Sequence, residues 1–219
     1  MALTLVIGNM NYSSWSMRPW LALKAAGIPF DEVKVPLYTE DPADKQRILH
    51  YSPAGKVPIL VDGAVTTWDS LAIIEYLAEK FPDKNIWPKD AAARAHARSI
   101  SAEMHSGFMA LRNECSMNIR RKVHVKALSA DAKANAERVQ EIWTACRKTY
   151  GQGGPFLFGA FSGADAMYAP VVHRFRIYGI EVAGTAAEYM QVVQRHPAFH
   201  AWSSAAAGET WVIEKFETD

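Results

Sequence analysis

The chain of 219 residues carries 24 Lys and Arg against 23 Asp and Glu, giving a net charge of +1, and 49% of its residues are hydrophobic. This balance argues against a nucleic-acid partner and a general membrane-surface role. Cys115 and Cys146, the two cysteines, are too few and too far apart for a disulfide framework, a Cys-x-x-Cys pair or a zinc motif. No apolar run is long enough to span a membrane and residues 1–7 are too short for a signal sequence, so we expect a cytoplasmic protein.

Strand and helix patterns alternate along the first part of the chain. Residues 3–7 form a short apolar run that predicts a buried strand. Serines then open a helix that tolerates Pro19 in its first turn and should end at Gly27. A second strand at residues 30–35 and a short helix at 42–49 follow.

Residues 52–63 contain the most informative local pattern in the first part of the chain. Pro58 stands at the start of an apolar, β-branched run and has no N–H to give to a sheet, which favours an edge, a bulge or a cis bond. Asp62-Gly63 predicts a tight hairpin turn. Asp69-Ser70 then precedes a helix, and the N–H groups at such an N-terminus favour an anion. Together these features could hold a small extended ligand.

The remainder of the chain predicts helices. A linker with two prolines covers residues 81–90 and is followed by a long helix at 91–121, within which Gly107 costs only about 1 kcal/mol. A second long helix covers 130–150. Ser162 and Asp165 have the spacing of a capping box before a helix that runs to about residue 177. The last helices are expected at 185–195 and 197–207.

The run Gly-Lys-Val-Pro-Ile-Leu at 55–60, followed by Trp-Asp-Ser-Leu-Ala-Ile-Ile-Glu-Tyr-Leu at 68–77, resembles the glutathione-binding half of cytosolic glutathione S-transferases. The resemblance implies an α/β thioredoxin-like domain at residues 1–82 and an all-helical domain at 91–219 that contributes the acceptor pocket. It also implies glutathione as co-substrate, no metal, and a homodimer. In this fold Pro58 should be cis.

The block Ser-Ser-Trp-Ser-Met-Arg at 13–18 resembles the zeta-class signature Ser-Ser-Cys-Ser-x-Arg, with Trp15 in place of the cysteine. The resemblance implies that Ser13 and Ser14 flank the glutathione sulfur. The expected glutathione-binding residues are Ser13, Ser14, Trp15, Lys56, Val57, Pro58, Asp69 and Ser70. Ordinary helix capping is the alternative role for each serine.

A serine at a helix N-terminus would suffice to activate a thiol. Lowering a thiol pKa of about 8.5 by two units requires about 2.7 kcal/mol, and one hydrogen bond to the charged sulfur supplies about 1.5–3 kcal/mol. We place this role on Ser14 ahead of Ser13, because Ser14 precedes Arg18 by four residues, as in theta-class transferases. Tyr12 is the rival donor, and Arg18 is either catalytic or bonded to nearby acceptors.

The acceptor pocket is expected beside the serine loop, along the long helix. Its candidate residues are Met109, Arg112, Asn113, Ser116 and Met117. Their polar, cationic character would suit an acidic or polarised electrophile. The alternative is a helix face that covers the core or a dimer partner. His105 is expected to be a packed helix residue rather than a metal ligand.

The leading hypothesis is therefore a glutathione transferase that attacks an electrophilic small molecule. One alternative is a zeta-like cis–trans isomerase such as maleylacetoacetate isomerase. Trp15 counts against it, as does the absence of a substrate-binding arginine in register after Asp165, since Arg174 and Arg176 are only near that position. The other alternative is a non-catalytic binding protein, which would not need Ser13, Ser14, Asp69 and Ser70 together.

Overall fold

The computed structural model describes residues 2–217, so the outermost ends of the expected parts 1–82 and 91–219 lie outside the described residues. The N-terminal part forms a four-stranded mixed sheet with the order β2-β1-β3-β4. Its strands are β1 (Leu3–Ile7), β2 (Phe30–Lys34), β3 (Ile59–Asp62) and β4 (Val65–Thr67). β1 runs parallel to β2 and antiparallel to β3, and β3 and β4 form the predicted hairpin.

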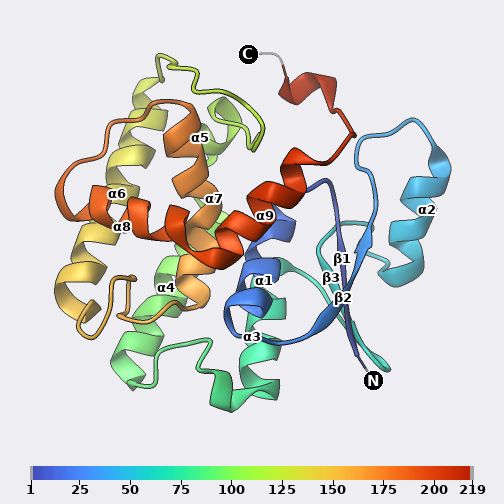
Figure 1. Ribbon diagram of the computed structural model, residues 1–219, viewed down its shortest axis with the longest axis horizontal. Coiled ribbons are helices and arrows are strands. Elements are labelled where there is room, and N and C mark those ends of the chain that lie inside the picture. Colours follow the sequence, from blue (N-terminus) through green and yellow to red (C-terminus); the bar gives the residue numbers. More distant parts are fainter. Residues whose placement is uncertain (1, 218–219) are drawn as a thin grey trace.

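Helices cover both faces of this sheet (Figure 1). They are α1 (Ser14–Ala25), α2 (Pro42–Tyr51), α3 (Ser70–Lys80) and the short 3-10 helix η1 (Pro82–Lys84). Successive side chains of a strand point to opposite faces. Accordingly Leu5 and Ile7 of β1 join the core beneath α1 and α3, whereas Val6 packs with Ile48 of α2 on the other face. This arrangement is the expected thioredoxin-like α/β fold.

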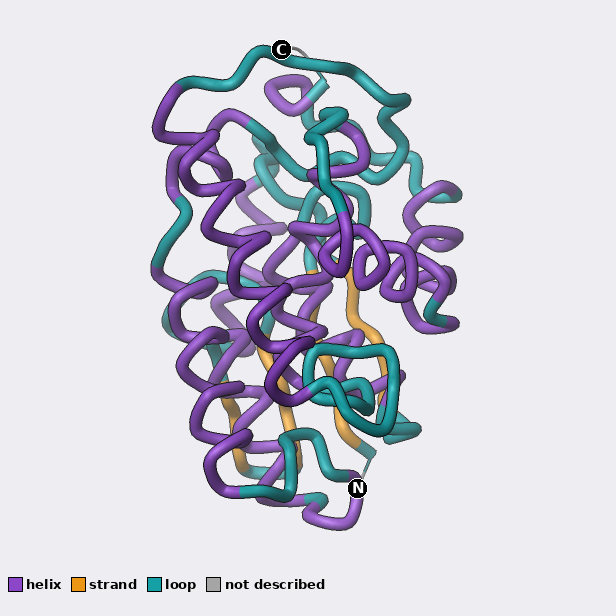
Figure 2. Tube along the Cα trace, turned by 90° about the vertical axis from the view of Figure 1, so that its left-hand side faces the viewer, coloured by secondary structure: helices purple, strands orange, loops and turns teal. Residues whose placement is uncertain are grey.

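Helices form most of the rest of the molecule (Figure 2). They are α4 (Ala91–Ser106), α5 (Met109–Glu114), α6 (Ala130–Tyr150), α7 (Gly163–Ile177), α8 (Gly184–Arg195), α9 (Pro197–Ala207) and the 3-10 helix η2 (Glu214–Phe216). The predicted helices at 130–150, 163–177, 185–195 and 197–207 are confirmed to within a residue or two. Within residues 2–217, no helix combines the length and the apolar character needed to cross a membrane.

The prediction of one helix over residues 91–121 is wrong. α4 ends at Ser106, Gly107 adopts an extended conformation, and Phe108 has a positive φ of 58° before α5 begins. Residues 115–129 contain no helix or strand. The guanidinium of Arg112 supports the break, because its Nη1 donates to the carbonyls of His105 and Gly107 at 3.3 and 3.4 Å. These carbonyls would otherwise lack partners at the helix end.

α7 is the buried centre of the helical region, packed against α1, α4 and α8. Its N-terminus has the predicted capping box. The Asp165 carboxylate accepts from both the N–H and the hydroxyl of Ser162 at 2.8 Å, and from the N–H of Leu157 at 3.1 Å. Burial raises the pKa of Asp165 to about 6 in spite of these bonds. The capping box thus fixes the start of α7, and the buried helix packs against α1.

The buried His173 of α7 generates a prediction about acid stability. Its Nε2 lies 3.1 Å from the carbonyl of Asn118, and burial lowers its pKa to about 4. In the unfolded chain a histidine takes up a proton near pH 6.5. The unfolded state therefore binds more protons between pH 6.5 and pH 4, so acidification through this range should destabilise the fold by at most about 3 kcal/mol.

We expect His173→Gln, which can still donate to Asn118, to lose less stability over this pH range than the unaltered protein. Urea unfolding at several pH values measures the difference. The exposed His200 provides the matched control, His200→Gln, which should follow the unaltered protein. Asp165 acts in the opposite direction, because its raised pKa makes the folded state bind more protons on acidification. Asp165 is present in all the proteins compared, so the difference between His173→Gln and the unaltered protein isolates the effect of His173. Equal pH dependence in His173→Gln would contradict a neutral, buried His173.

Candidate functional site

A loop before β3 lies at the centre of the candidate site. The Val57–Pro58 peptide bond is cis, as predicted. Two cavities of about 610 and 440 Å³ meet at this loop, and three residues, Trp15, Lys56 and Val57, line both of them. The two cavities therefore form one extended groove that passes the N-terminus of α1.

The larger cavity is closed by the segment after β2 and by α2. Ser13 lines it, together with residues 36–39 and the Lys45 side of α2. Lys45 Nζ donates to the carbonyl of Gly55 at 2.7 Å, which ties α2 to the loop before Pro58. This end of the groove contains one lysine from the loop, Lys56, and one from the helix.

The smaller cavity ends at the N-terminus of α3. Asp69 is the N-cap and accepts from the N–H of Leu71 at 3.0 Å, and its other carboxylate oxygen lies 3.1 Å from Nε2 of His105 in α4. Ser70 also lines this cavity, and its buried Oγ has no hydrogen-bond partner among the described residues. A buried hydroxyl is normally satisfied, so this one is available to a ligand.

Ser13 and Ser14 lie together at the start of α1 but have different partners. Ser13 is the N-cap; its Oγ accepts from the N–H of Ser16 at 3.3 Å and donates to Ser16 Oγ at 2.8 Å. Ser14 Oγ accepts from Nη2 of Arg174 in α7 at 3.3 Å. Ser13 lines the larger cavity, whereas Ser14 lines neither cavity and faces the helical region. Both serines are buried.

Two arginines, Arg18 and Arg112, pack against Trp15, and a third, Arg174, reaches the neighbouring Ser14. The guanidinium carbons of Arg18 and Arg112 lie 4.2 and 4.4 Å from the centre of its indole ring. Burial lowers the pKa of Arg18 and of Arg174, and repulsion among the three guanidinium groups lowers both further, that of Arg174 to about 10. Among residues 2–217, no carboxylate lies within 4 Å of any of the three. This arginine cluster is thus positively charged and lies next to the groove, although none of the three arginines lines either cavity.

The guanidinium groups are also incompletely hydrogen-bonded. Arg18 donates through Nε to the carbonyl of Met167 at 3.2 Å, and both of its terminal nitrogens are buried without a partner in the described chain. Arg174 Nη1 is likewise buried and unpartnered. Arginine carries five donors, so most of the donors of Arg18 are unused. Unused buried donors on positive groups favour an anion at this site.

The expected acceptor residues are not brought together as one group. Arg112 alone among them contacts Trp15, and none of the five lines the two cavities. Met109 and Asn113 are exposed, and Met117 is part of the core. Ser116 Oγ lies 3.2 Å from the hydroxyl of Tyr178. The break after α4 explains this scatter, because these residues do not share the face of a continuous helix.

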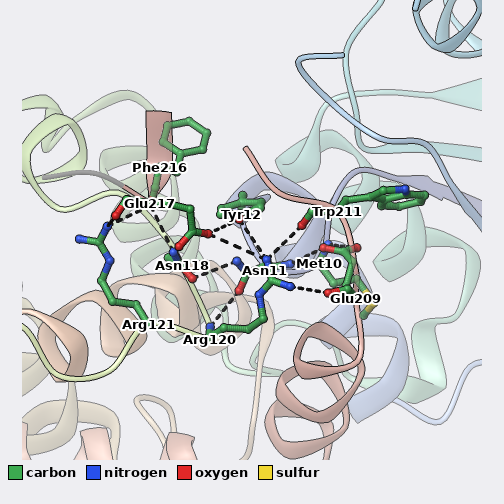
Figure 3. Close-up of polar contacts among 10 residues, drawn as sticks. All are labelled: Met10, Asn11, Tyr12, Asn118, Arg120, Arg121, Glu209, Trp211, Phe216 and Glu217. Atoms are coloured by element: carbon green, nitrogen blue, oxygen red, sulfur yellow. Dashed lines mark hydrogen bonds and ion pairs between the residues drawn. The ribbon is translucent and has the colours of Figure 1, made fainter. Parts of the chain in front are cut away.

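The hydroxyl of Tyr12 is hydrogen-bonded to Glu217 and Arg120 (Figure 3). It donates to the carboxylate of Glu217 and accepts from Nη2 of Arg120 at 3.0 Å. The same C-terminal segment supplies Glu209, whose carboxylate accepts from the N–H groups of Met10 and Asn11 at 2.9 and 3.1 Å. Tyr12 therefore anchors the C-terminal segment to the loop before α1.

The protein's own thiols are poorly suited to nucleophilic chemistry. Cys115 and Cys146 are both buried and free, and burial raises their pKa values to about 11 and 12. Such thiols are almost entirely protonated at neutral pH. Within residues 2–217, no three His, Cys, Asp or Glu side chains are grouped as metal ligands would be.

Sequence reasoning missed two residues of the site. His105 is packed, with its ring 5.1 Å from that of Trp15, but its pairing with Asp69 is not predictable from the sequence. Arg174 was considered only as an out-of-register substrate contact. No local signal could have linked it to Ser14, because 160 residues separate the two.

Two family models match this chain, one in its sheet-containing part and one in its helical part. The family model "Glutathione S-transferase, N-terminal domain" matches residues 12–80, and the model "Glutathione S-transferase, C-terminal domain" matches residues 123–205. A "Probable maleylacetoacetate isomerase" of Caenorhabditis elegans is 46% identical over 101 residues, which cover 46% of this chain and 45% of that protein. "Glutathione S-transferase 1" of Dianthus caryophyllus is 30% identical over 180 residues, covering 80% and 79% of the two chains.

A solved structure supports the fold over almost the whole chain. The crystal structure of a glutathione transferase homologue from Burkholderia, with bound glutathione, has a TM-score of 0.68. It covers 94% of this chain and 98% of its own at 24% identity, a likeness that concerns the fold alone. The two family models and the similarity to the Dianthus caryophyllus protein identify the family as well as the fold. The chain belongs to the glutathione S-transferase family.

Proposed function

We propose that the protein is a glutathione transferase, in which residues 1–82 hold glutathione and residues 91–219 contribute the acceptor site. The observation that carries this proposal is the continuous groove from Ser13 to Ser70, with Trp15 and the cis-proline loop between them. Its two adjoining cavities, of about 610 and 440 Å³, have room and polar lining residues for an extended tripeptide. A co-substrate supplies the nucleophile, since the buried cysteines do not.

Each end of the groove matches one part of glutathione. The N–H and C=O of Val57 would pair with the backbone of its cysteinyl residue, beside Lys56 and Pro58. Asp69 would accept from the α-ammonium group, and Ser70 with the N-terminal N–H groups of α3 would bind the γ-glutamyl carboxylate. The free, buried Oγ of Ser70 supports this orientation.

The bound thiol would ionise at the N-terminus of α1. Its S–H proton passes to water, and the thiolate then forms a C–S bond. It either displaces a leaving group, which departs with its electron pair, or adds to an activated C=C bond whose other carbon takes a proton from water. The helix terminus contributes about 0.3–1 kcal/mol to the anion, and a hydroxyl hydrogen bond contributes about 1.5–3 kcal/mol. The surrounding arginines add positive potential. Arg112, against Trp15, would favour an acceptor that is acidic or polarised.

Two alternatives remain distinct in their expected behaviour. Similarity to a protein named as a probable maleylacetoacetate isomerase supports a glutathione-dependent cis–trans isomerisation, in which the thiolate adds, the bond rotates and the thiolate leaves. A non-catalytic binding protein would bind glutathione without accelerating its reactions. Assays with a generic electrophilic aromatic and with a diacid that has one cis C=C bond conjugated to a ketone separate the three hypotheses, since a binding protein would accelerate neither reaction.

Ser70→Ala should weaken glutathione binding. It would remove a hydroxyl hydrogen bond to a carboxylate, worth about 1.5–3 kcal/mol, or roughly 10- to 150-fold in Kd. Asp69 caps α3, so the helix itself should survive the change. Calorimetric titration with glutathione measures the effect. The exposed Ser99 of α4 offers a matched control, Ser99→Ala, which should bind normally. An unchanged Kd in Ser70→Ala would place the ligand elsewhere.

Ser14→Ala should raise the pKa of the bound glutathione thiol by about one to two units, because it removes about 1.5–3 kcal/mol of anion stabilisation. Glutathione affinity should change less, since Val57, Asp69 and Ser70 hold the rest of the tripeptide. Thiolate absorbance against pH measures the shift, with Ser13→Ala as the comparison. The Ser13 proton is already directed to Ser16, which favours Ser14 as the donor, although Ser13 lines the cavity. A shift confined to Ser13→Ala would assign the role to Ser13.

We also propose that the protein acts in the cytoplasm as a homodimer, with the first part of one subunit against the helical part of the other. It should then sediment near twice its chain mass of 24.3 kDa. Analytical ultracentrifugation at micromolar concentration tests this, and a monomer would contradict it.

A further inference from the structure

Arg174 connects the buried centre of the helical region to the proposed thiol site. It is held on α7, and its Nε donates to the carbonyl of Cys115 at 2.8 Å. The opposite edge of the guanidinium reaches Ser14, where Nη2 donates to Oγ at 3.3 Å. The side chain is 4% exposed. One planar group thus bridges two elements with little freedom to move.

The direction of this hydrogen bond determines what the Ser14 hydroxyl can do. A serine hydroxyl has one proton and two acceptor lone pairs. Because arginine can only donate, Ser14 accepts from it and keeps its single proton for another acceptor. The Ser13 proton, by contrast, is directed to Ser16 Oγ at 2.8 Å. Of the two serines, Ser14 is the one whose proton has no acceptor among the described residues.

The charge around Ser14 favours an anion as that acceptor. The titratable and charged groups around this region, besides Arg174 itself, are Arg18, Arg112, Asp69, His105, Cys115, Tyr168 and Tyr178. Two of these seven groups are arginines, and Asp69, the one carboxylate among them, is paired with His105. Arg174 Nη1 is buried without a partner among residues 2–217. A thiolate near Ser14 would offset part of this positive charge.

We propose that Arg174 is the positioning residue of Ser14: it fixes the hydroxyl so that its single proton is directed at the glutathione sulfur. This inference rests on the proposed function, in which glutathione binds in the groove beside α1. Arg174 acts mainly through Ser14, so its effect should depend on the presence of the serine hydroxyl. It reaches the site from the helical region, whereas the expected glutathione contacts come from residues 13–70.

The test is a titration of the bound glutathione thiol by its thiolate absorbance. Arg174→Gln retains a donor for the Cys115 carbonyl but loses the charge, and Arg174→Met fills similar volume without either. In both variants we expect the thiol pKa to rise by about one unit, which is tenfold less thiolate at a given pH below it. Arg176, exposed and two residues away on α7, gives the matched control Arg176→Gln, with no expected shift.

The double variant Ser14→Ala/Arg174→Gln tests whether the two residues act together. If Arg174 acts through Ser14, the double variant should have nearly the same thiol pKa as Ser14→Ala. Glutathione Kd, from calorimetry, and thermal unfolding are measured alongside. Either single Arg174 variant is sufficient if the other fails to fold.

The outcomes separate this inference from the proposed function. Absence of glutathione binding in the unaltered protein would overturn both. Normal binding with an unshifted thiol pKa in a folded Arg174 variant would overturn the role of Arg174 alone. Additive shifts in the double variant would show that Arg174 acts independently of Ser14, and would overturn its positioning role.

Discussion

The burial of α1 between the sheet and α7 is the constraint on which the site depends. Side chains of α1 such as Met17 and Leu21 belong to one continuous core that also contains Leu5 of β1 and Met167 of α7. Because protein interiors are close-packed, α1 cannot shift against either neighbour without opening a void. Its N-terminus, with Ser13 and Ser14, is therefore held where the sheet-based part meets the helices. The cis-proline loop precedes β3 and α3 follows β4, so the same sheet positions both of them, and together with α1 they form the groove.

This packing buries two charged side chains, Arg18 and Arg174, which opposes folding electrostatically. Arg18 and Arg174 are buried without a carboxylate partner among the described residues, and burial of such charges opposes folding. Two backbone carbonyls and the indole of Trp15 offset part of that cost, with each cation–π contact worth about 0.5–2 kcal/mol. Apolar side chains of similar volume would often be more stable there. Groups that oppose stability yet lie beside a ligand groove are expected at functional sites.

Much of the fold follows from local patterns in the sequence. The strand of residues 3–7, the Asp62-Gly63 hairpin, the Asp69 cap and the Ser162–Asp165 box depend on a few adjacent residues, and the structure contains them all. The break after α4 was missed because one glycine costs a helix little. It is stabilised by Phe108 in a left-handed conformation and by Arg112 on the exposed carbonyls, which no helical periodicity reveals.

The site residues that belong to short sequence motifs could be predicted. Contacts between residues that are far apart in the sequence could not. The groove contains Ser13, Trp15, Val57 and Ser70 as the resemblance implied, whereas the pairing of Arg174 with Ser14 depends on how α7 packs on α1. Trp15 shows why the substitution within the serine block is physically consistent. An indole has no thiol group and cannot form a thiolate. Its electron-rich face can instead lie against Arg18 and Arg112, whose charges have no carboxylate partner in the described structure. At the position where the zeta-class signature has a thiol, this chain therefore places an aromatic face that two arginines contact.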